Sequence, residues 1–388
     1  MINTAKIFAA FDHNPKTRLI FGLDAADRVG ELAVELGIKK PLLVTDPGVV
    51  AAGHMERVRR SLARVNIEPV IYDKVRENPT TRDVQECLNA ARVPSIDGII
   101  GLGGGSSMDT AKGCNFLMTN GGRMQDYWGV GKAARSMLPL IAIPTTAGTG
   151  SECQSFALIA DETTHQKMAC GDPKAAPRVA VLDPTLTVSQ PSRVTAWTGI
   201  DALAHALETA VTNKRNTLSQ SYSREAFRLC FHYLPRVLQK GGDLESRAGM
   251  LLGAALAGLA IENSMLGAAH AAANPLTAHF QIVHGQAVGL MLPWVIRFNA
   301  EDPATARLYE GLQGGTVDQL VARLEWLLNL AGMPRSLADF QVKSSDIPNL
   351  AAEAAKQWTA AFNPRPVAAA DFARLYQAAF QKRGDGVE

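Results

Sequence analysis

Residues 95–112 read SIDGIIGLGGGSSMDTAK, and this stretch decides the fold. An apolar run typical of a strand leads into three consecutive glycines, and two serines then open a segment of helical composition. Glycines let a backbone come close to a phosphate, and a helix N-terminus offers unpaired N–H groups and a partial positive charge. The stretch therefore predicts a strand, a pyrophosphate-binding loop and a helix. A flexible strand-to-helix turn is the alternative interpretation.

Similar apolar runs recur along the first half of the chain. They lie at 41–45, 69–72, 98–102, 140–143 and 179–182, and amphipathic stretches such as ADRVGELAVELG separate them. Alternation of strands and helices favours an α/β fold with a mostly parallel sheet. After Asp183-Pro184 nearly every segment has helical spacing. We therefore expect an α/β dinucleotide-binding domain over residues 1–188 and an all-α domain over residues 189–388.

Composition excludes several classes of protein. A length of 388 residues favours two domains, and a net charge of +2 gives no electrostatic case for nucleic acid or acidic membranes as partners. The five cysteines are scattered and odd in number, which favours a reducing cytoplasm. Residues 1–16 lack the pattern of a signal peptide. The most apolar run, Met250 to Ile261, is too short to span a bilayer, so we expect a buried helix there.

Two further loops follow predicted strands. Asp46 ends the strand in PLLVTDPGVV, where its carboxylate could accept from ribose hydroxyls and repel a 2′-phosphate, which favours NAD over NADP. Alternatively, Asp46 caps the next turn. The stretch IPTTAGTGSE, residues 143–152, offers Thr145, Thr146 and Thr149 as donors to ribose or phosphate oxygens. The alternative is that these threonines bond their own backbone.

Histidines gather in two alanine-rich stretches of the second half. In GIDALAHALET, residues 199–209, Asp201 and His205 lie one helical turn apart and share a face. The stretch GAAHAAANPLTAHFQIVHGQAVG, residues 267–289, adds His270, His279 and His284. A buried carboxylate needs a positive partner, and a divalent ion with imidazole ligands would supply one. Fe²⁺ or Zn²⁺ fits this donor set, with Mn²⁺ or Co²⁺ also compatible. The alternatives are core histidines and a capping box from Thr198 to Asp201.

These stretches, taken in order, resemble the iron-containing (group III) alcohol dehydrogenases over nearly the whole chain. The stretches that carry the resemblance are TRLIFG, VTD at Asp46, NPT at Asn78, GGGSSMDTAK, PTTAGTGSE, GIDALAHALE, the segment with His270 and His284, FN at Asn299 and the late NPRPV. The resemblance implies an architecture like that of dehydroquinate synthase: an N-terminal dinucleotide-binding domain, a C-terminal helical domain and a site in the cleft between them. It also implies a homodimer or larger assembly.

The resemblance assigns roles to particular residues. It places the metal ligands at Asp201, His205, His270 and His284. The implied cofactor contacts are Asp46, Asn78, Gly104, Gly105, Ser106, Asp109, Thr145, Thr146, Thr149, Lys167 and Leu186. Many family members carry a histidine four residues after the third ligand, linked to proton movement, but this sequence has Asn274, which cannot titrate near neutral pH. His279 is a candidate to replace it as a catalytic residue, and a surface or pocket-lining position is the alternative.

The implied activity is metal-assisted hydride transfer between NAD(H) and an alcohol with its aldehyde or ketone. Rival interpretations within the same architecture are a glycerol-type polyol dehydrogenase, a dehydroquinate-synthase-like enzyme and a maleylacetate-reductase-like enzyme that works without metal. All four ligand positions are filled, which argues against the metal-free case. A non-catalytic nucleotide-binding protein of this fold is the rival from another class.

Overall fold

The computed structural model describes residues 11–92, 95–164 and 166–380, so much of the N-terminal stretch considered above lies outside the described residues. The chain forms two compact units. The sheet unit comprises described residues from 15–191 together with 241–255, and the helical unit comprises 11–14, 192–240 and 256–380. We expected a single division after residue 188. The chain instead passes into the helical unit after Pro191 and returns briefly to the sheet unit.

The sheet unit is built on a six-stranded parallel sheet with strand order β1-β9-β6-β4-β2-β3. Its strands are β1 (Arg18–Phe21), β2 (Pro41–Val44), β3 (Val70–Tyr72), β4 (Gly98–Gly103), β6 (Leu140–Pro144) and β9 (Val179–Leu182). In register, Ile100 lies between Leu43 and Ile141. The five strands expected from the sequence are all present, and β1 is an additional strand at one edge.

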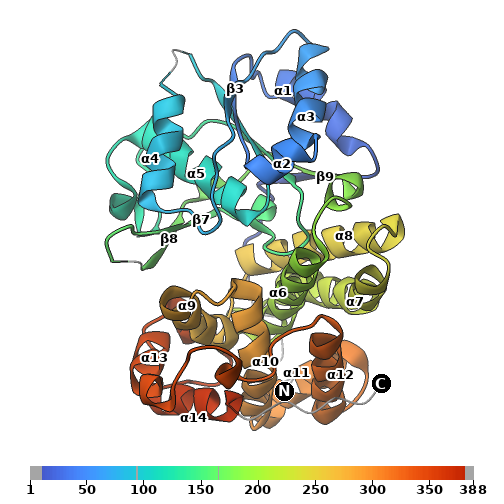
Figure 1. The fold of residues 1–388 in the computed structure, drawn as a ribbon, viewed down its shortest axis with the longest axis vertical. Helices are drawn as coiled ribbons and strands as arrows, with labels where there is room; N and C mark the ends of the chain where they lie inside the picture. The colour runs from blue at the N-terminus through green and yellow to red at the C-terminus, as the bar shows by residue number, and fades with distance from the viewer. Residues whose placement is uncertain (1–10, 93–94, 165, 381–388) are drawn as a thin grey trace, which may run out of the picture. The chain divides into compact units, whose positions relative to one another are not determined.

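Helices cover both faces of this sheet. They are α1 (Val29–Glu35), α2 (Pro47–Ala51), α3 (His54–Ala63), α4 (Thr81–Ala90) and α5 (Gly105–Asn120). Successive strand residues point to opposite faces, so Leu43 packs in one core with Leu32 and Leu62. Leu42 packs in another core with Cys114. Figure 1 shows the result, with α4 and α5 on one side of the strands and α1 to α3 on the other. The apolar runs of β2, β4, β6 and β9 follow from this two-sided burial, whereas β3, at the edge of the sheet, is only partly buried.

A smaller sheet packs against α5. It consists of β5 (Gly129–Val130), β8 (Lys167–Gly171) and β7 (Phe156–Ala160), with β7 and β8 antiparallel. Phe116, Ile159 and Met168 share one core there. Three short 3-10 helices matter for the site, namely η2 (Ala25–Arg28), η4 (Ser151–Cys153) and η6 (Pro184–Thr187). The strands β5, β7 and β8 were not expected from the sequence.

The described residues of the helical unit form helices joined by turns, as the sequence predicts. They are α6 (Ser192–Val211), α7 (Thr217–Gln239), α9 (Ala268–Phe280), α10 (His284–Ala300), α11 (Pro303–Gln313), α12 (Val317–Leu330), α13 (Ile347–Ala354) and α14 (Ala369–Ala379). Helix α6 packs against α7, α10 and α11, and its alanines are fully buried. Small side chains let neighbouring helices come close, so α6 can bring polar side chains on different helices together.

Helix α8 (Leu244–Glu262) contains the most apolar run of the chain. At 19 residues it is longer than the twelve-residue run suggested, and among the described residues it is the one helix long and apolar enough to cross a membrane. The expectation that length alone excludes a span was therefore wrong. Two thirds of its most apolar window (67%) is buried inside the protein, as is typical of a core helix.

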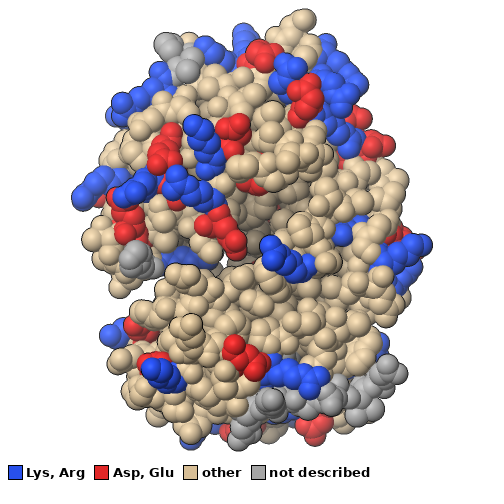
Figure 2. Space-filling model, viewed as in Figure 1, with Lys and Arg blue, Asp and Glu red and all other residues tan. Residues whose placement is uncertain are grey.

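Charged side chains of both signs are interspersed on the face drawn in Figure 2.

Candidate metal centre and nucleotide-binding loops

Three helices of the helical unit bring one carboxylate and three imidazoles together. Asp201 Oδ1 lies 3.5 Å from His205 Nε2, 3.4 Å from His270 Nε2 and 3.9 Å from His284 Nε2. Ligand atoms about 2.1 Å from a common centre in a tetrahedron are about 3.4 Å apart, so these separations match a four-ligand metal site. Ligand atoms of Asp201, His270 and His284 all lie within 4.8 Å of one another. His205 joins them through Asp201, and its ring stacks on that of His270.

Local sequence explains why these side chains converge. Asp201 and His205 are one turn apart on α6, while His270 lies in the first turn of α9 and His284 begins α10. Gly285 permits the close approach of α10 to α6, because a Cβ there would lie 2.2 Å from the Trp197 carbonyl oxygen. Asp201 stands in the middle of a helix that begins at Ser192. The alternative of a capping box beginning at Thr198 is therefore wrong.

The cluster keeps its carboxylate ionised and leaves two buried polar atoms without a hydrogen bond to any described residue. Burial raises the pKa of Asp201, but His205, His270 and His284 outweigh it and hold that pKa well below its usual value. Within the described part of the chain, Asp201 Oδ1 and His270 Nε2 are buried and make no hydrogen bond. Buried polar atoms are rarely left without a hydrogen-bond partner, and an ion bound between these two atoms would satisfy both. His284 is 24% exposed, whereas the other three side chains are 4–6% exposed.

Glu208 completes the cluster and was missed by sequence reasoning. It is buried, and its Oε2 accepts a hydrogen bond from His270 Nδ1. Burial lowers the pKa of His270, but the Glu208 and Asp201 carboxylates outweigh burial and raise it to about 9. The signal was present in GIDALAHALET, because positions seven apart on a helix share a face. Asp201 and Glu208 have that spacing.

His279 lies outside this cluster. It is nine residues beyond His270 on α9, which places it about half a helical circumference away. Its ring is 50% exposed, and Nε2 pairs with Glu353 Oε2 at 2.7 Å. Asn274 lies four residues beyond His270, and its side-chain amide donates to Gln357 Oε1 over 3.0 Å. This placement argues against a catalytic role for His279 and favours the surface alternative.

In the sheet unit, strand order identifies a ligand crevice. From β2 the chain moves outward to β3, whereas from β4 it moves the other way to β6 and β9. Open α/β sheets bind ligands at such a reversal, beyond the carboxyl ends of the strands. Asp46 follows β2 and Gly104 follows β4, and Asp46 Oδ2 accepts from Ser107 Oγ over 3.3 Å. The two loops predicted from the sequence thus meet at the switch point.

The glycine loop lies so close to the threonine loop that Gly104 and Gly105 have little space for a side chain. A Cβ on Gly105 would lie 2.7 Å from Thr149 Cγ2, and one on Gly104 would lie 3.2 Å from Thr146 Cγ2. Gly104 is the N-cap of α5 and makes no side-chain cap, so the first N–H groups of a 16-residue helix face this loop. Such a helix start suits a pyrophosphate. The loop therefore fits a dinucleotide better than a merely flexible turn.

The other nucleotide candidates divide into exposed and buried positions. Asn78 is exposed, and its N–H donates to Ser106 Oγ over 3.3 Å. Asp46 Oδ1 also caps α2 by accepting from Val49 N, and Thr149 Oγ1 accepts from Ser151 N. The alternative interpretations, a helix cap at Asp46 and a local backbone bond at Thr149, are therefore present too. The remaining candidates are Thr145, which bonds Gly103 O through its N–H, Lys167, which begins β8, and two buried side chains, Asp109 and Leu186.

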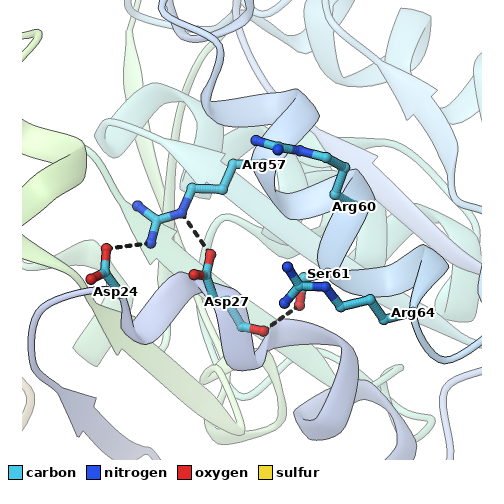
Figure 3. A pocket seen from close by; sticks show the side chains of 6 residues that line it. All are labelled: Asp24, Asp27, Arg57, Arg60, Ser61 and Arg64. Carbon is cyan, nitrogen blue, oxygen red and sulfur yellow. Dashed lines mark hydrogen bonds and ion pairs between the residues drawn. The ribbon is translucent and has the colours of Figure 1, made fainter.

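A third cluster is an ion-pair junction. Arg57 on α3 donates to Asp24 and Asp27, and Ser61 Oγ donates to Asp27 O (Figure 3). Arg57 also donates to Thr185 Oγ1. Because Arg57 donates from all three of its nitrogens, this pocket fastens α3 to η2 and η6 rather than offering a site.

Family models cover almost all of the described chain. A model described as iron-containing alcohol dehydrogenase matches residues 15–184, and one described as the C-terminal part of the Fe-containing alcohol dehydrogenase family matches residues 195–380. The chain belongs to the iron-containing alcohol dehydrogenase family. Membership makes it an alcohol oxidoreductase of the iron-containing family, as the resemblance implied.

Individual relatives agree with this assignment. Alcohol dehydrogenase 4 of Schizosaccharomyces pombe is 38% identical over 84% of this chain and 79% of its own length. The NAD-dependent methanol dehydrogenase of Bacillus methanolicus is 32% identical over 92% of this chain and 96% of its own. A crystal structure of 1,3-propanediol oxidoreductase matches with a TM-score of 0.91 and 32% identity, covering 96% of this chain and 100% of that one. This iron-containing alcohol dehydrogenase therefore shares the fold of an alcohol oxidoreductase along nearly its full length.

Proposed function

We propose that Asp201, His205, His270 and His284 hold one divalent ion, Fe²⁺ first and Zn²⁺ as the alternative. The observation that carries this proposal is the convergence of three imidazole nitrogens on one carboxylate oxygen at 3.4–3.9 Å. Their separations suit shared coordination, and two of the buried atoms, Asp201 Oδ1 and His270 Nε2, make no hydrogen bond to other described residues.

We propose further that the switch-point loops hold NAD. Gly104, Gly105 and the start of α5 would bind the pyrophosphate, with Ser106, Thr146 and Thr149 around it. Asp46 would accept from the adenosine ribose, and its charge would oppose a 2′-phosphate, which favours NAD over NADP. Asn78, Asp109, Thr145, Lys167 and Leu186 would complete the surroundings of the cofactor, with the buried ones acting through packing.

The chemistry follows from the two groups that the residues would hold. When bound, a divalent ion supplies a Lewis acid for the substrate oxygen, and NAD supplies a hydride acceptor. The chain's own residues orient these groups: Asp201 offsets the ionic charge, and the imidazoles fix the place of the ion. Fully buried alanines beside Asp201 and His205 on α6, and beside His270 on α9, keep water away from these three side chains.

The substrate that we propose is a small alcohol or its aldehyde. Relatives are named for methanol and for 1,3-propanediol, and short primary alcohols are the first compounds to test. We propose a cytoplasmic enzyme, because the five cysteines are all buried and unpaired by disulfides. We also propose a homodimer or larger assembly without nucleic-acid or membrane partners. Phe21, the last residue of the edge strand β1, and Leu23, two residues beyond it, are about half exposed, which supports self-association.

The test combines metal analysis with turnover. The protein, reconstituted with Fe²⁺ or Zn²⁺, should reduce NAD with short alcohols, followed as NADH absorbance. Asp201→Asn should lose both bound metal and activity, because it removes the charge that offsets the ion. His232→Ala, which removes an exposed imidazole on α7, should keep both. Full activity after metal removal would overturn the proposal and favour a metal-free reductase. Tight NAD and metal binding without turnover of any alcohol or aldehyde would favour a non-catalytic protein.

A further inference from the structure

Glu208 touches two donors on the neighbouring helix α9. Its Oε2 accepts from His270 Nδ1, and its Oε1 accepts from Ala269 N over 2.7 Å. Glu208 is 3% exposed, so neither bond competes with bulk water. Both carboxylate oxygens are therefore committed to the first turn of α9, where His270 stands.

We propose that Glu208 is a positioning residue that fixes the tautomer and the orientation of His270. A neutral imidazole that donates from Nδ1 carries no proton on Nε2, and Nε2 is then the ligand atom. His270 Nε2 lies 3.4 Å from Asp201 Oδ1, on the side where the four candidate ligands converge. This inference rests on the proposed function, because it takes His270 to be a metal ligand.

Two donors explain why the residue is a glutamate. A carboxylate offers an acceptor oxygen to each of Ala269 N and His270 Nδ1, whereas a glutamine offers one oxygen and one NH₂ group. If the glutamine oxygen kept its bond to Ala269 N, the NH₂ group would face His270 Nδ1. The imidazole would then have to accept at Nδ1 and carry its proton on Nε2, which blocks the ligand atom.

A pair of asparagines holds the same helix start. Asn363 Oδ1 accepts from Ala268 N over 3.2 Å, and Asn363 Nδ2 donates to Asn299 Oδ1 over 2.7 Å. Both asparagines are buried. A Cβ on Gly267 would lie 3.0 Å from Asn363 Oδ1 and 3.1 Å from Glu208 Oε1. Asn299 belongs to the FN stretch and Asn363 to the NPRPV stretch, which were quoted for the family resemblance without a role. Together these asparagines hold the N–H of Ala268, two residues before His270, and so fix where α9 begins.

A simpler role for Glu208 is that of a helix cap for α9. The two roles differ in what Glu208→Gln should do. A glutamine oxygen can still cap Ala269 N, so a cap alone predicts that the variant behaves like the wild type. Positioning of His270 predicts a loss, because the second acceptor is gone. Glu353 provides a matched control, since its carboxylate pairs with His279 on the same helix but at an exposed position.

The experiment titrates metal-free, full-length protein with Co²⁺ and follows the visible absorption of the bound ion. Glu208→Gln should weaken Co²⁺ binding about 10- to 100-fold and change the spectrum, while Glu353→Gln should leave both as in the wild type. Turnover should fall in Glu208→Gln with little change in the KM for NAD. Far-UV circular dichroism and NAD binding report whether each variant is folded.

Glu208→Asp is the second variant, in case the glutamine variant does not fold. It keeps the charge and both oxygens but withdraws them by one methylene, so it should also weaken Co²⁺ binding. Wild-type affinity and spectrum in a folded Glu208→Gln or Glu208→Asp protein would overturn the inference and leave the proposed function intact. Failure of the wild-type protein itself to bind Co²⁺ would instead overturn the proposed function.

Discussion

Lys112 Nζ donates to Ser151 Oγ over 2.8 Å and to the Ser151 carbonyl oxygen over 2.6 Å. Lys112 ends the GGGSSMDTAK stretch, and Ser151 belongs to PTTAGTGSE, so a buried ammonium group ties together the two loops proposed to hold NAD. Ser151 Oγ in turn donates to Asp109 Oδ1 over 2.9 Å. Burial raises the pKa of Asp109, and the charge of Lys112 opposes that rise.

Replacing Lys112 by methionine should destabilise the protein strongly. Lys112→Met keeps a similar shape but removes the larger of the two lysine charges, Lys112 and Lys167, that act on the buried Asp109 carboxylate. It also leaves both acceptors on Ser151 without this donor, and removing one member of a buried charged network costs about 3–5 kcal/mol in comparable cases. Urea unfolding followed by circular dichroism measures the loss. The double variant Lys112→Met/Asp109→Asn should recover part of it, because the uncompensated charge is removed. Equal losses in the single and double variants would show that the charge of Asp109 is not what Lys112 offsets.

Asp46→Ser should relax the preference for NAD over NADP. Serine can still cap α2 through its hydroxyl, as Asp46 does at Val49 N, so the helix start is preserved. The negative charge that would oppose a 2′-phosphate is lost. Steady-state kinetics should show kcat/KM for NADP rising at least several-fold relative to that for NAD. An unchanged ratio in the folded variant would place the ribose elsewhere.

Gly285→Ala should weaken the metal centre through packing. The added Cβ would meet the Trp197 carbonyl oxygen, which belongs to the backbone of α6 and cannot rotate away. Helix α10 must then move, and His284 at its first position moves with it. Metal content after dialysis should fall below that of the wild type. Gly311→Ala is the control, because its helical site on α11 has open space and should gain up to about 1 kcal/mol of stability.

His279→Ala should leave turnover and metal content close to those of the wild type. Its imidazole is half exposed and pairs with Glu353, and exposed ion pairs of this kind contribute about 0–1 kcal/mol. Steady-state kinetics and metal analysis of the purified variant test this. A fall in kcat of tenfold or more with normal metal content would restore His279 as a catalytic residue and contradict its placement on the far side of α9.

Local sequence patterns were enough to predict strands that are buried on both faces and helices whose apolar residues recur at helical spacing. The five strands with continuous apolar runs and the helical second half follow from such patterns. The shared face of Asp201 and His205 on α6 also follows from local spacing, whereas the choice of His270 and His284 as their partners came from the family resemblance. Strands β1, β7 and β8 were missed although each is longer than the predicted β3, so their length is not the reason. Strand β1 pairs with β9, which lies far along the chain, and no local pattern shows that pairing.

Contacts across space were the part that the sequence could not supply. Glu208 and Lys112 both lie within stretches quoted for other reasons, yet their partners come from distant segments, α9 for Glu208 and η4 for Lys112. The switch point likewise requires the strand order, since nothing local to Asp46 or Gly104 reveals that their strands are neighbours. The longer extent of α8 was missed because its first turn is polar, which hid the helix start.

Glu152 should make stability fall as pH rises. It is 2% exposed, and burial raises the pKa of its carboxyl group to about 7. The folded state then holds this proton more tightly than the unfolded chain, whose value is 4.5. Between these two values the folded state binds more protons, so the free energy of unfolding decreases with pH, by up to about 3 kcal/mol in total. Above about pH 7 this loss is complete, and the group causes no further change with pH.

Glu152→Gln tests this by keeping the shape and removing the titration. At pH 5 the variant and the wild type should differ little, and at pH 8 the variant should be the more stable, because it never has to bury a charge. Urea unfolding at both pH values gives the difference, in which titration of all other groups cancels. Glu162→Gln, at a 42% exposed carboxylate paired with Arg82, should change stability by the same small amount at both pH values. A Glu152→Gln protein that is less stable than the wild type at pH 8 would mean that the charged carboxylate is stabilised by a partner, and burial would no longer explain its titration.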